Sequence, residues 1–183
     1  MADRRLNATA ASLLGFLHER PLSGYELAVT AQQVIGDFWS LTQSQVYREL
    51  AWMADAGLVE RGEPEQRDRR RYTLTDAGRA AFDEWMRRVP GPETIRHPLL
   101  LALRFGRHVP GERLTAYLRQ HRDVHAEKLR TYEEQAAALD SAPASARDPF
   151  QVATLAFGIA YERAVMDWFT QLPALLGQDD AVL

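Results

Sequence analysis

The sequence contains no cysteine, which excludes disulfide bonds and thiolate metal sites within the chain. A chain without thiols is suited to a reducing cytoplasm, where disulfides rarely form. The chain also lacks a basic and then apolar leader, and none of its apolar runs approaches the roughly 20 residues that span a bilayer. We therefore expect a soluble, cytoplasmic protein with no membrane partner.

The patterns that mark common enzyme classes are missing as well. The chain has no glycine-rich phosphate-binding loop, no nucleophile elbow and no HExxH sequence. None of the five histidines has a convincing acidic partner at helical spacing. The sequence therefore predicts a protein that is not an enzyme and needs no cofactor.

Charge is nearly balanced over the chain and concentrated in one place. The 183 residues carry a formal net charge of −3, whereas many DNA-binding proteins are basic overall. The first 90 residues hold 12 arginines against 13 acidic residues, but residues 67–71 hold four arginines against one aspartate. If this chain binds DNA, we expect a small electrostatic footprint and an affinity that depends on dimerisation.

Residues 41–78 carry the most informative pattern, which begins with a helix. Thr42 is suited to be its N-cap, because the hydroxyl can accept a backbone N–H bond, and Gly57 can adopt the left-handed turn that ends a helix. Apolar residues at steps of three and four share one buried face: Val46, Leu50, Met53 and Ala54. The opposite face carries Ser44, Gln45, Arg48 and Trp52.

A helix of this size fits the major groove of DNA, where glutamine and arginine side chains can make paired hydrogen bonds to adenine and guanine. Gln45 and Arg48 are therefore the candidate base-contacting residues. The full set of DNA-contacting residues predicted on this helix is Thr42, Gln43, Ser44, Gln45, Tyr47 and Arg48.

Two short extended runs follow the helix, at residues 58–61 and 71–74. The segment between them contains the glycine, proline and aspartate of a turn, so the pair predicts a β-hairpin. Arginines lie near its tip: Arg67, Arg69, Arg70 and Arg71. Each guanidinium offers a planar fork of donors that matches phosphate oxygens, so we expect contacts that fix the register on DNA and not its sequence.

Further helices flank this segment. Two are expected before it, over residues 7–19 and 23–35, and Thr75 is suited to cap another over residues 76–89. The sequence thus predicts a mainly α-helical chain, with a winged helix-turn-helix domain and a two-stranded β-wing in residues 1–90. The alternative for such a domain is a winged-helix adaptor that binds protein instead of DNA.

Several stretches resemble one known family: Leu13–Leu17, Pro21–Leu27, Phe38–Trp39, Gln45–Tyr47, Ala56–Val59 and Arg71–Gly78. The segment from Leu13 to Trp85 resembles the winged helix-turn-helix domain of PadR-family transcriptional regulators. The resemblance implies that the helix after Thr42 enters the major groove, that the hairpin follows the DNA backbone, and that a helical C-terminal region forms a dimer. It also implies repression, which is the action of most members. Arg48 stands where the family usually has a proline.

Proline and glycine at residues 90–92 interrupt the chain. Helices are predicted beyond them over residues 96–105, 110–139 and 148–172, the last ended by Pro173. The middle helix would span about 45 Å, which is longer than a small domain needs for its own core. It is therefore expected to pack against a partner.

Residues 91–183 are accordingly interpreted as an α-helical dimerisation domain. The predicted homodimer interface comprises Leu114, Leu118, His121, His125, Leu129, Tyr132, Phe157, Tyr161 and Trp168. A two-fold axis would set two copies of the DNA-contacting helix against a near-palindromic site.

The family resemblance also implies a small aromatic or drug-like effector. Candidate pocket residues are Trp85, Phe157, Tyr161, Trp168 and Phe169. The alternative is that these aromatic residues, at helical spacing, form ordinary core.

His121 and His125 lie four residues apart, a spacing at which two imidazoles on one helix face can share zinc. No cysteine or suitably placed carboxylate completes a tetrahedral site, so we expect no metal and instead hydrogen bonds across the dimer. The sequence as a whole predicts a homodimeric DNA-binding repressor released by an effector. A protein-binding adaptor and a histidine-based metal sensor are the alternatives.

Overall fold

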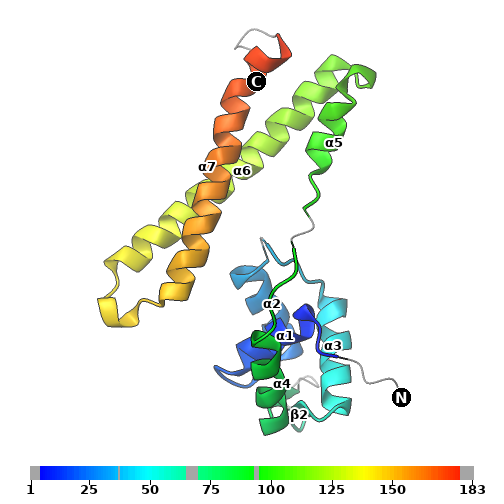
Figure 1. Ribbon diagram of the computed structural model, residues 1–183, viewed down its shortest axis with the longest axis vertical. Helices are drawn as coiled ribbons and strands as arrows, with labels where there is room; N and C mark the ends of the chain where they lie inside the picture. The colour runs from blue at the N-terminus through cyan, green and yellow to red at the C-terminus, as the bar shows by residue number, and fades with distance from the viewer. Residues whose placement is uncertain (1–4, 37, 65–69, 93–94, 178–183) are drawn as a thin grey trace. The chain divides into compact units, whose positions relative to one another are not determined.

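The computed structural model describes residues 5–36, 38–64, 70–92 and 95–177 (Figure 1). The chain divides into two compact units, Met1–Pro92 and Glu93–Leu183. Most described residues are helical, and one small antiparallel sheet accompanies the helices of the first unit. The mainly α-helical, winged helix-turn-helix fold class expected from the sequence is confirmed. No helix in these segments is long and apolar enough to cross a membrane.

The helices of the N-terminal unit are α1 (Ala8–Leu17), α2 (Gly24–Val34), α3 (Gln43–Asp55) and α4 (Asp76–Met86). Each begins after a polar residue whose side chain accepts a backbone N–H bond from the first turn: Asn7, Ser23, Thr42 and Thr75. Such a bond satisfies a donor that has no partner within the helix. The caps predicted at Thr42 and Thr75 are confirmed, and they fix where α3 and α4 start.

The sheet of this unit has the strand order β1-β3-β2. Its strands are β1 (Leu22–Ser23), β2 (Val59–Arg61) and β3 (Arg71–Leu74). The predicted hairpin is formed by β2 and β3, with Val59 opposite Leu74. Strand β1 escaped prediction because two residues are too few to show the alternation that marks a strand. The hairpin tip with Arg67 and Arg69 lies outside the described residues.

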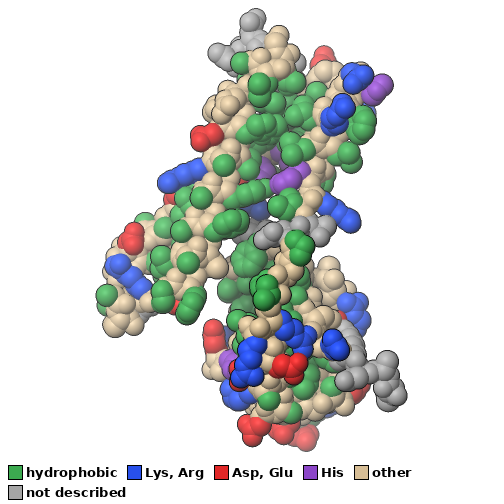
Figure 2. Space-filling model, in the orientation of Figure 1, with side chains coloured by type: hydrophobic (Ala, Val, Ile, Leu, Met, Phe, Trp, Pro, Cys, Tyr) green, Lys and Arg blue, Asp and Glu red, His purple; other side chains and the backbone are tan. Residues whose placement is uncertain are grey.

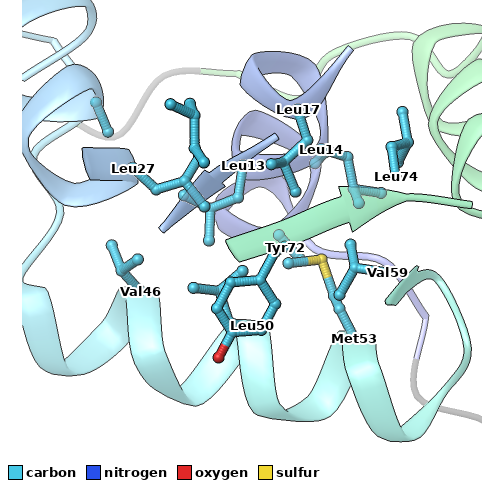
Figure 3. Packing of buried hydrophobic residues seen from close by; sticks show 14 of the residues in the cluster. Leu13, Leu14, Leu17, Leu27, Val46, Leu50, Met53, Val59, Tyr72 and Leu74 are labelled. Carbon is cyan, nitrogen blue, oxygen red and sulfur yellow. The ribbon is translucent and has the colours of Figure 1, made fainter. Parts of the chain in front are cut away.

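A single hydrophobic core holds the N-terminal unit together (Figure 3). Figure 3 shows that Val46, Leu50 and Met53 of α3 point toward α1 and the sheet, and all three have 0% exposure. The burial of this face leaves the polar face of α3 in solvent. One part of the predicted polar face is wrong: Trp52 is partly buried against the core. It lies three residues after the buried Glu49, on the same side of the helix.

The C-terminal unit consists of α5 (Pro98–Arg104), η2 (Gly106–His108), α6 (Gly111–Ser141), η3 (Ala144–Ala146) and α7 (Pro149–Leu176). Helix α7 returns alongside α6 (Figure 1). A small core of Leu99, Leu118, Phe169 and Leu172 joins α5, α6 and α7.

The predicted end of α7 at Pro173 is wrong. Pro173 lies inside the helix, which continues to Leu176 and ends at Gly177 with a left-handed φ of 64°. A proline inside a helix lacks the N–H of one backbone hydrogen bond, and its ring crowds the carbonyl four residues earlier. Helix α7 continues for less than one turn beyond Pro173.

The predicted dimer interface needs correction at one position, because α6 and α7 cover part of each other. Leu118 is only 1% exposed within the chain. His125 is hydrogen-bonded through Nδ1 to Glu162 of α7, and its place in the dimer interface stays a prediction. Conversely, Phe157 is 72% exposed. The buried side of α7 contains Glu162, Phe169 and Leu172, so the aromatic stripe predicted from the sequence lies mainly beside it.

Candidate nucleic-acid interface

A compact hydrogen-bond network caps the N-terminal end of α3. The Thr42 hydroxyl accepts the backbone N–H of Gln45 at 3.3 Å. In return, the Oε1 atom of Gln45 accepts the backbone N–H of Thr42 at 2.8 Å and the Thr42 hydroxyl at 3.0 Å. The Ser44 hydroxyl lies 3.1 Å from that of Thr42. This reciprocal capping box went unnoticed in the sequence, although the spacing of threonine and glutamine three residues apart is its signature.

The polar residues predicted to contact DNA lie together on the exposed surface of α3. Gln43, Ser44 and Tyr47 are exposed, and Gln45 is half-buried. The Tyr47 ring also packs on the start of α2, because a Cβ atom on Gly24 would lie 2.5 Å from Tyr47 Cε1. Glycine at position 24 therefore allows α2 to approach α3 closely, and Tyr47 helps to hold the two helices in place.

Arg48 extends from the same helix into solvent. Its side chain is 63% exposed, and its Nε atom lies 3.6 Å from Oε1 of Glu49. Glu49 itself is only 2% exposed and accepts a hydrogen bond from Asn7 Nδ2 at 3.4 Å. The sequence prediction missed this buried acid, although Glu49 lies three residues after Val46 and four before Met53, on the buried stripe. The hydrogen bond between Asn7 and Glu49 connects the N-cap of α1 to α3.

The base of the hairpin is attached to α2 through Arg71. Its Nη1 atom donates to the backbone carbonyl of Pro21 at 3.3 Å and lies 3.7 Å from a carboxylate oxygen of Glu26. Glu26 also accepts the backbone N–H of Ser23 at 2.8 Å. The hydrogen bonds from the Ser23 backbone and side chain, aided by the Arg71 charge, lower the pKa of Glu26. Arg71 is thus engaged within its own unit.

Two other arginines at the hairpin are more exposed to solvent. Arg70 is exposed and directly precedes β3. Arg61 of β2, which the sequence prediction did not include, is exposed and lies with its guanidinium carbon 5.8 Å from the centre of the Tyr72 ring. Figure 2 shows basic and acidic side chains side by side on the visible face of the unit with α1 to α4, without one continuous basic surface.

The candidate effector residues differ in their burial within their own units. Phe157 and Tyr161 are exposed, whereas Phe169 is buried with Trp168 packed edge-on at 4.9 Å between ring centres. Trp85 packs against the core of the N-terminal unit. The alternative assignment to core therefore fits Phe169, and the other positions stay predictions.

The C-terminal unit contains a buried polar pair that the sequence prediction missed. His125 Nδ1 lies 2.5 Å from Glu162 Oε2, and Glu162 is only 3% exposed. The signal was present, since Glu162 lies three residues before Val165 and seven before Phe169 on one helix face. Among the residues that the structure describes, no group of three or more acidic or histidine side chains is placed to hold a metal ion.

Two family models together match most of the chain. Residues 13–84 match the model described as the transcriptional regulator PadR-like family. Residues 95–177 match the model described as the C-terminal part of virulence activator alpha.

Full-length relatives share this arrangement. The negative transcriptional regulator PadR of Bacillus subtilis is 26% identical over 176 residues, which cover 92% of this chain and 97% of the relative. Its crystal structure with operator DNA has a TM-score of 0.77 at 23% identity, over 94% of this chain and 99% of the other. Its structure with p-coumaric acid has a TM-score of 0.69 at 24% identity, over 95% and 99%.

A third structure extends the similarity beyond one protein. The virulence activator AphA of Vibrio cholerae has a TM-score of 0.72 at 26% identity, over 93% of this chain and 98% of the other.

Proposed function

Because this chain belongs to the PadR-like family of transcriptional regulators, we propose that it is a homodimeric repressor that binds a near-palindromic promoter site. Family membership makes it a DNA-binding regulator rather than an enzyme, as expected from the sequence. The proposal adds the direction of regulation, the oligomeric state and the form of the site.

The observation that carries the proposal is the capped, polar N-terminal end of α3. The apolar side of this helix is fully buried, so its position within the unit is fixed. The polar side presents Ser44, Gln45 and Arg48 to solvent at the first turns. In helix-turn-helix proteins, the N-terminal residues of the recognition helix contact base edges in the major groove. Helix α3 has the surface that this role requires.

The hairpin supplies contacts to the DNA backbone in this proposal. Arg61 on β2 and Arg70 just before β3 are exposed, and Arg67 and Arg69 lie between the two strands in the sequence. The related Bacillus subtilis regulator was crystallised with operator DNA. We expect this chain to use the same unit for DNA, with phosphate contacts that set its orientation.

Dimerisation is supported by the exposed apolar side of the C-terminal unit. Phe150 and Phe157 of α7 are 81% and 72% exposed, and Tyr161 is 37% exposed. These residues are spaced by seven and four positions and so follow one stripe along the helix. Large exposed apolar stripes of this kind mark sites of protein interaction. A second copy of the chain covers this stripe in the proposed dimer.

Release from DNA by a small aromatic effector is the remaining part of the proposal. The Bacillus subtilis relative was crystallised with p-coumaric acid, an aromatic carboxylic acid. In this chain, Tyr161 stacks with His97 at 6.5 Å between ring centres and an angle of 14°. Because the second copy covers this stripe in the proposed dimer, an effector would contact Tyr161 and Phe157 at the interface between the two copies.

Fluorescence anisotropy tests the proposal most directly. The full chain is titrated against a labelled duplex from the region upstream of its own gene and against a scrambled duplex, over a series of salt concentrations. A tighter, salt-sensitive interaction with the upstream duplex supports a self-regulating repressor. Equal weak binding to both places the target elsewhere, and no binding to either favours the protein-binding adaptor. Light scattering at micromolar concentration tests the dimer, and a monomer contradicts it.

A further inference from the structure

The capping box at the start of α3 limits how Gln45 can contact a base. A side-chain amide has one carbonyl oxygen with two lone pairs and one nitrogen with two N–H donors. In this structure the Oε1 atom receives the backbone N–H of Thr42 at 2.8 Å and the Thr42 hydroxyl at 3.0 Å. With Ser44 as the donor in the 3.1 Å bond between the two hydroxyls, the Thr42 proton goes to Gln45, and both acceptor positions of the oxygen are occupied within the protein.

The orientation of the amide follows from the chemistry of its partner. The backbone N–H of Thr42 can only donate, so the atom that lies 2.8 Å from it must be the oxygen of Gln45. The nitrogen then lies on the other side of the amide. None of the residues that the structure describes accepts a hydrogen bond from this nitrogen. Its two donors are available to a ligand.

The donors lie where DNA contacts are expected. Gln45 is in the first turn of α3, and the first turns of a recognition helix face base edges in the major groove. The familiar glutamine contact to adenine uses both halves of the amide, because the nitrogen donates to N7 and the oxygen accepts from the N6 amino group. An oxygen held by Thr42 cannot make the second of these bonds.

We propose that Gln45 recognises its base through N–H donors alone. This inference rests on the proposed DNA-binding function and specifies its chemistry at one position. The base opposite Gln45 must present an acceptor in the major groove, namely N7 or O6 of guanine, N7 of adenine or O4 of thymine. The exocyclic amino groups of adenine and cytosine are not read by this side chain. Paired glutamine–adenine recognition, which the sequence alone suggested, is replaced by contact with acceptors.

Gln45→Glu separates this role from the cap. Glutamate keeps an oxygen for the Thr42 N–H, is the preferred partner in a capping box, and places a negative charge at the positive end of the helix. The variant therefore keeps its thermal stability but has no N–H donors. We expect its preference for a specific duplex over a scrambled duplex to fall by about 5- to 150-fold, the range of one good base contact.

Two controls isolate the donors from other effects. Gln33→Glu makes the same isosteric change on an exposed side chain of α2, outside the predicted DNA-contacting set, and measures the effect of charge alone. Gln45→Ala removes the cap and the donors together, so it lowers thermal stability as well as sequence preference. The preference ratio cancels the part of the affinity that does not depend on sequence.

Single-group base analogues then identify the atom that Gln45 contacts. The probe is the duplex that the full wild-type chain selects from a random pool. One base at a time is replaced by 7-deazaguanine or 7-deazaadenine, which lack N7, by 5-methyl-2-pyrimidinone, which lacks the thymine O4, or by purine, which lacks the adenine amino group. We expect an analogue that lacks the contacted acceptor to weaken DNA binding by the wild type. The same analogue at the same position should not affect DNA binding by Gln45→Glu.

Each outcome decides the inference. The inference is supported if deletion of an acceptor atom weakens DNA binding by the wild type but not by Gln45→Glu, and if Gln45→Glu is as stable as the wild type. The inference is overturned if deletion of the adenine amino group weakens the wild type but not Gln45→Glu. It is also overturned if Gln45→Glu keeps the wild-type sequence preference or unfolds at a lower temperature than the wild type. If the wild type selects no duplex at all, the proposed DNA-binding function fails first, and the inference fails with it.

Discussion

Replacement of His125 by alanine tests how strongly the C-terminal unit depends on its buried polar pair. The Nδ1 atom of His125 lies 2.5 Å from Glu162 Oε2, and the side chain of Glu162 is 4% exposed. The imidazole also lies 6.3 Å from the Phe169 ring. His125→Ala therefore removes the partner of a buried carboxyl group and part of the packing around it.

The expected loss of stability is large because the carboxyl group cannot reach water. Removal of one partner from a buried charged pair costs about 3–5 kcal/mol, whereas an exposed pair contributes about 0–1 kcal/mol. The Glu162 side chain is 4% exposed and that of His125 is 21% exposed, so this pair lies closer to the first case. For a chain of this size, each kcal/mol shifts the Tm by about 2–4 °C. His125→Ala should lower the Tm of the chain by about 6–20 °C.

The control and the rescue separate the pair from simple loss of volume. His121→Ala truncates the same residue type one turn earlier on α6, where the imidazole makes no hydrogen bond to any described residue, and should change the Tm by less than half as much. Glu162→Gln, combined with His125→Ala, removes the buried charge and should recover about 1–3 kcal/mol. Calorimetry and thermal circular dichroism measure all four proteins. Equal losses for both histidine variants, or no recovery in the double variant, would refute the argument.

Three further changes probe the other parts of the structure. Gly78→Ala should cost about 3 kcal/mol or more and lower the Tm in a thermal melt, because the added Cβ would lie 2.1 Å from the carbonyl oxygen of Leu58; an unchanged Tm would contradict this packing. Arg70→Ala should reduce the slope of log affinity against log salt by about 0.9 for each phosphate that the arginine neutralises in the wild type. Arg71→Ala should lower the affinity without that change in slope, because the guanidinium of Arg71 is engaged within the unit. The reverse pattern would exchange the roles of the two arginines. Phe157→Glu should convert the dimer to a monomer in light scattering, since it places a charge on a side chain that is 72% exposed in the single chain, and a variant that stays dimeric would remove Phe157 from the interface.

Features set by local chemistry were the most predictable from the sequence. The starts of α3 and α4 follow from Thr42 and Thr75, because a capping side chain bonds only to backbone within the next few residues. The ends of helices were less predictable. Helix α4 ends at Met86, whereas the pattern extended to residue 89, and α7 continues beyond Pro173. The end of a helix depends on fraying and on packing against other elements, and neither can be inferred from a single residue of the sequence.

The faces of α6 and α7 illustrate what periodicity cannot supply. Helix α7 has apolar residues around most of its circumference, so the sequence allowed more than one buried stripe. The stripe predicted from the sequence contained Phe157 and Tyr161. In the structure, Glu162 and Phe169 are the residues buried against the rest of the unit. An acidic residue in a mainly apolar helix is normally assigned to solvent. Only its tertiary partner, His125, makes that burial acceptable.

The candidate site was predicted at the level of residue type but not of bonding. The exposed polar side of α3, with Gln45 and Arg48, followed from the helical period alone. That period contains no information on which side-chain atoms are already used. The oxygen of Gln45 is committed to Thr42, and Arg71 is committed to Pro21 and Glu26. Both residues still belong to the surface, but with fewer groups available to DNA than the sequence suggested.

If the chain binds DNA as the proposed dimer, the small number of available groups makes dimerisation necessary for tight binding. Within the described residues, the arginines exposed around α3 and the hairpin include Arg48, Arg61 and Arg70. If each contacts one phosphate, a single subunit gives a salt slope of about −3, and two subunits on one duplex give about −5. In a chain of net charge −3, a single subunit has little further attraction to DNA. The second subunit therefore supplies half of the electrostatic free energy as well as the second half-site, so a change that separates the dimer should abolish tight binding even with every DNA-contacting side chain intact.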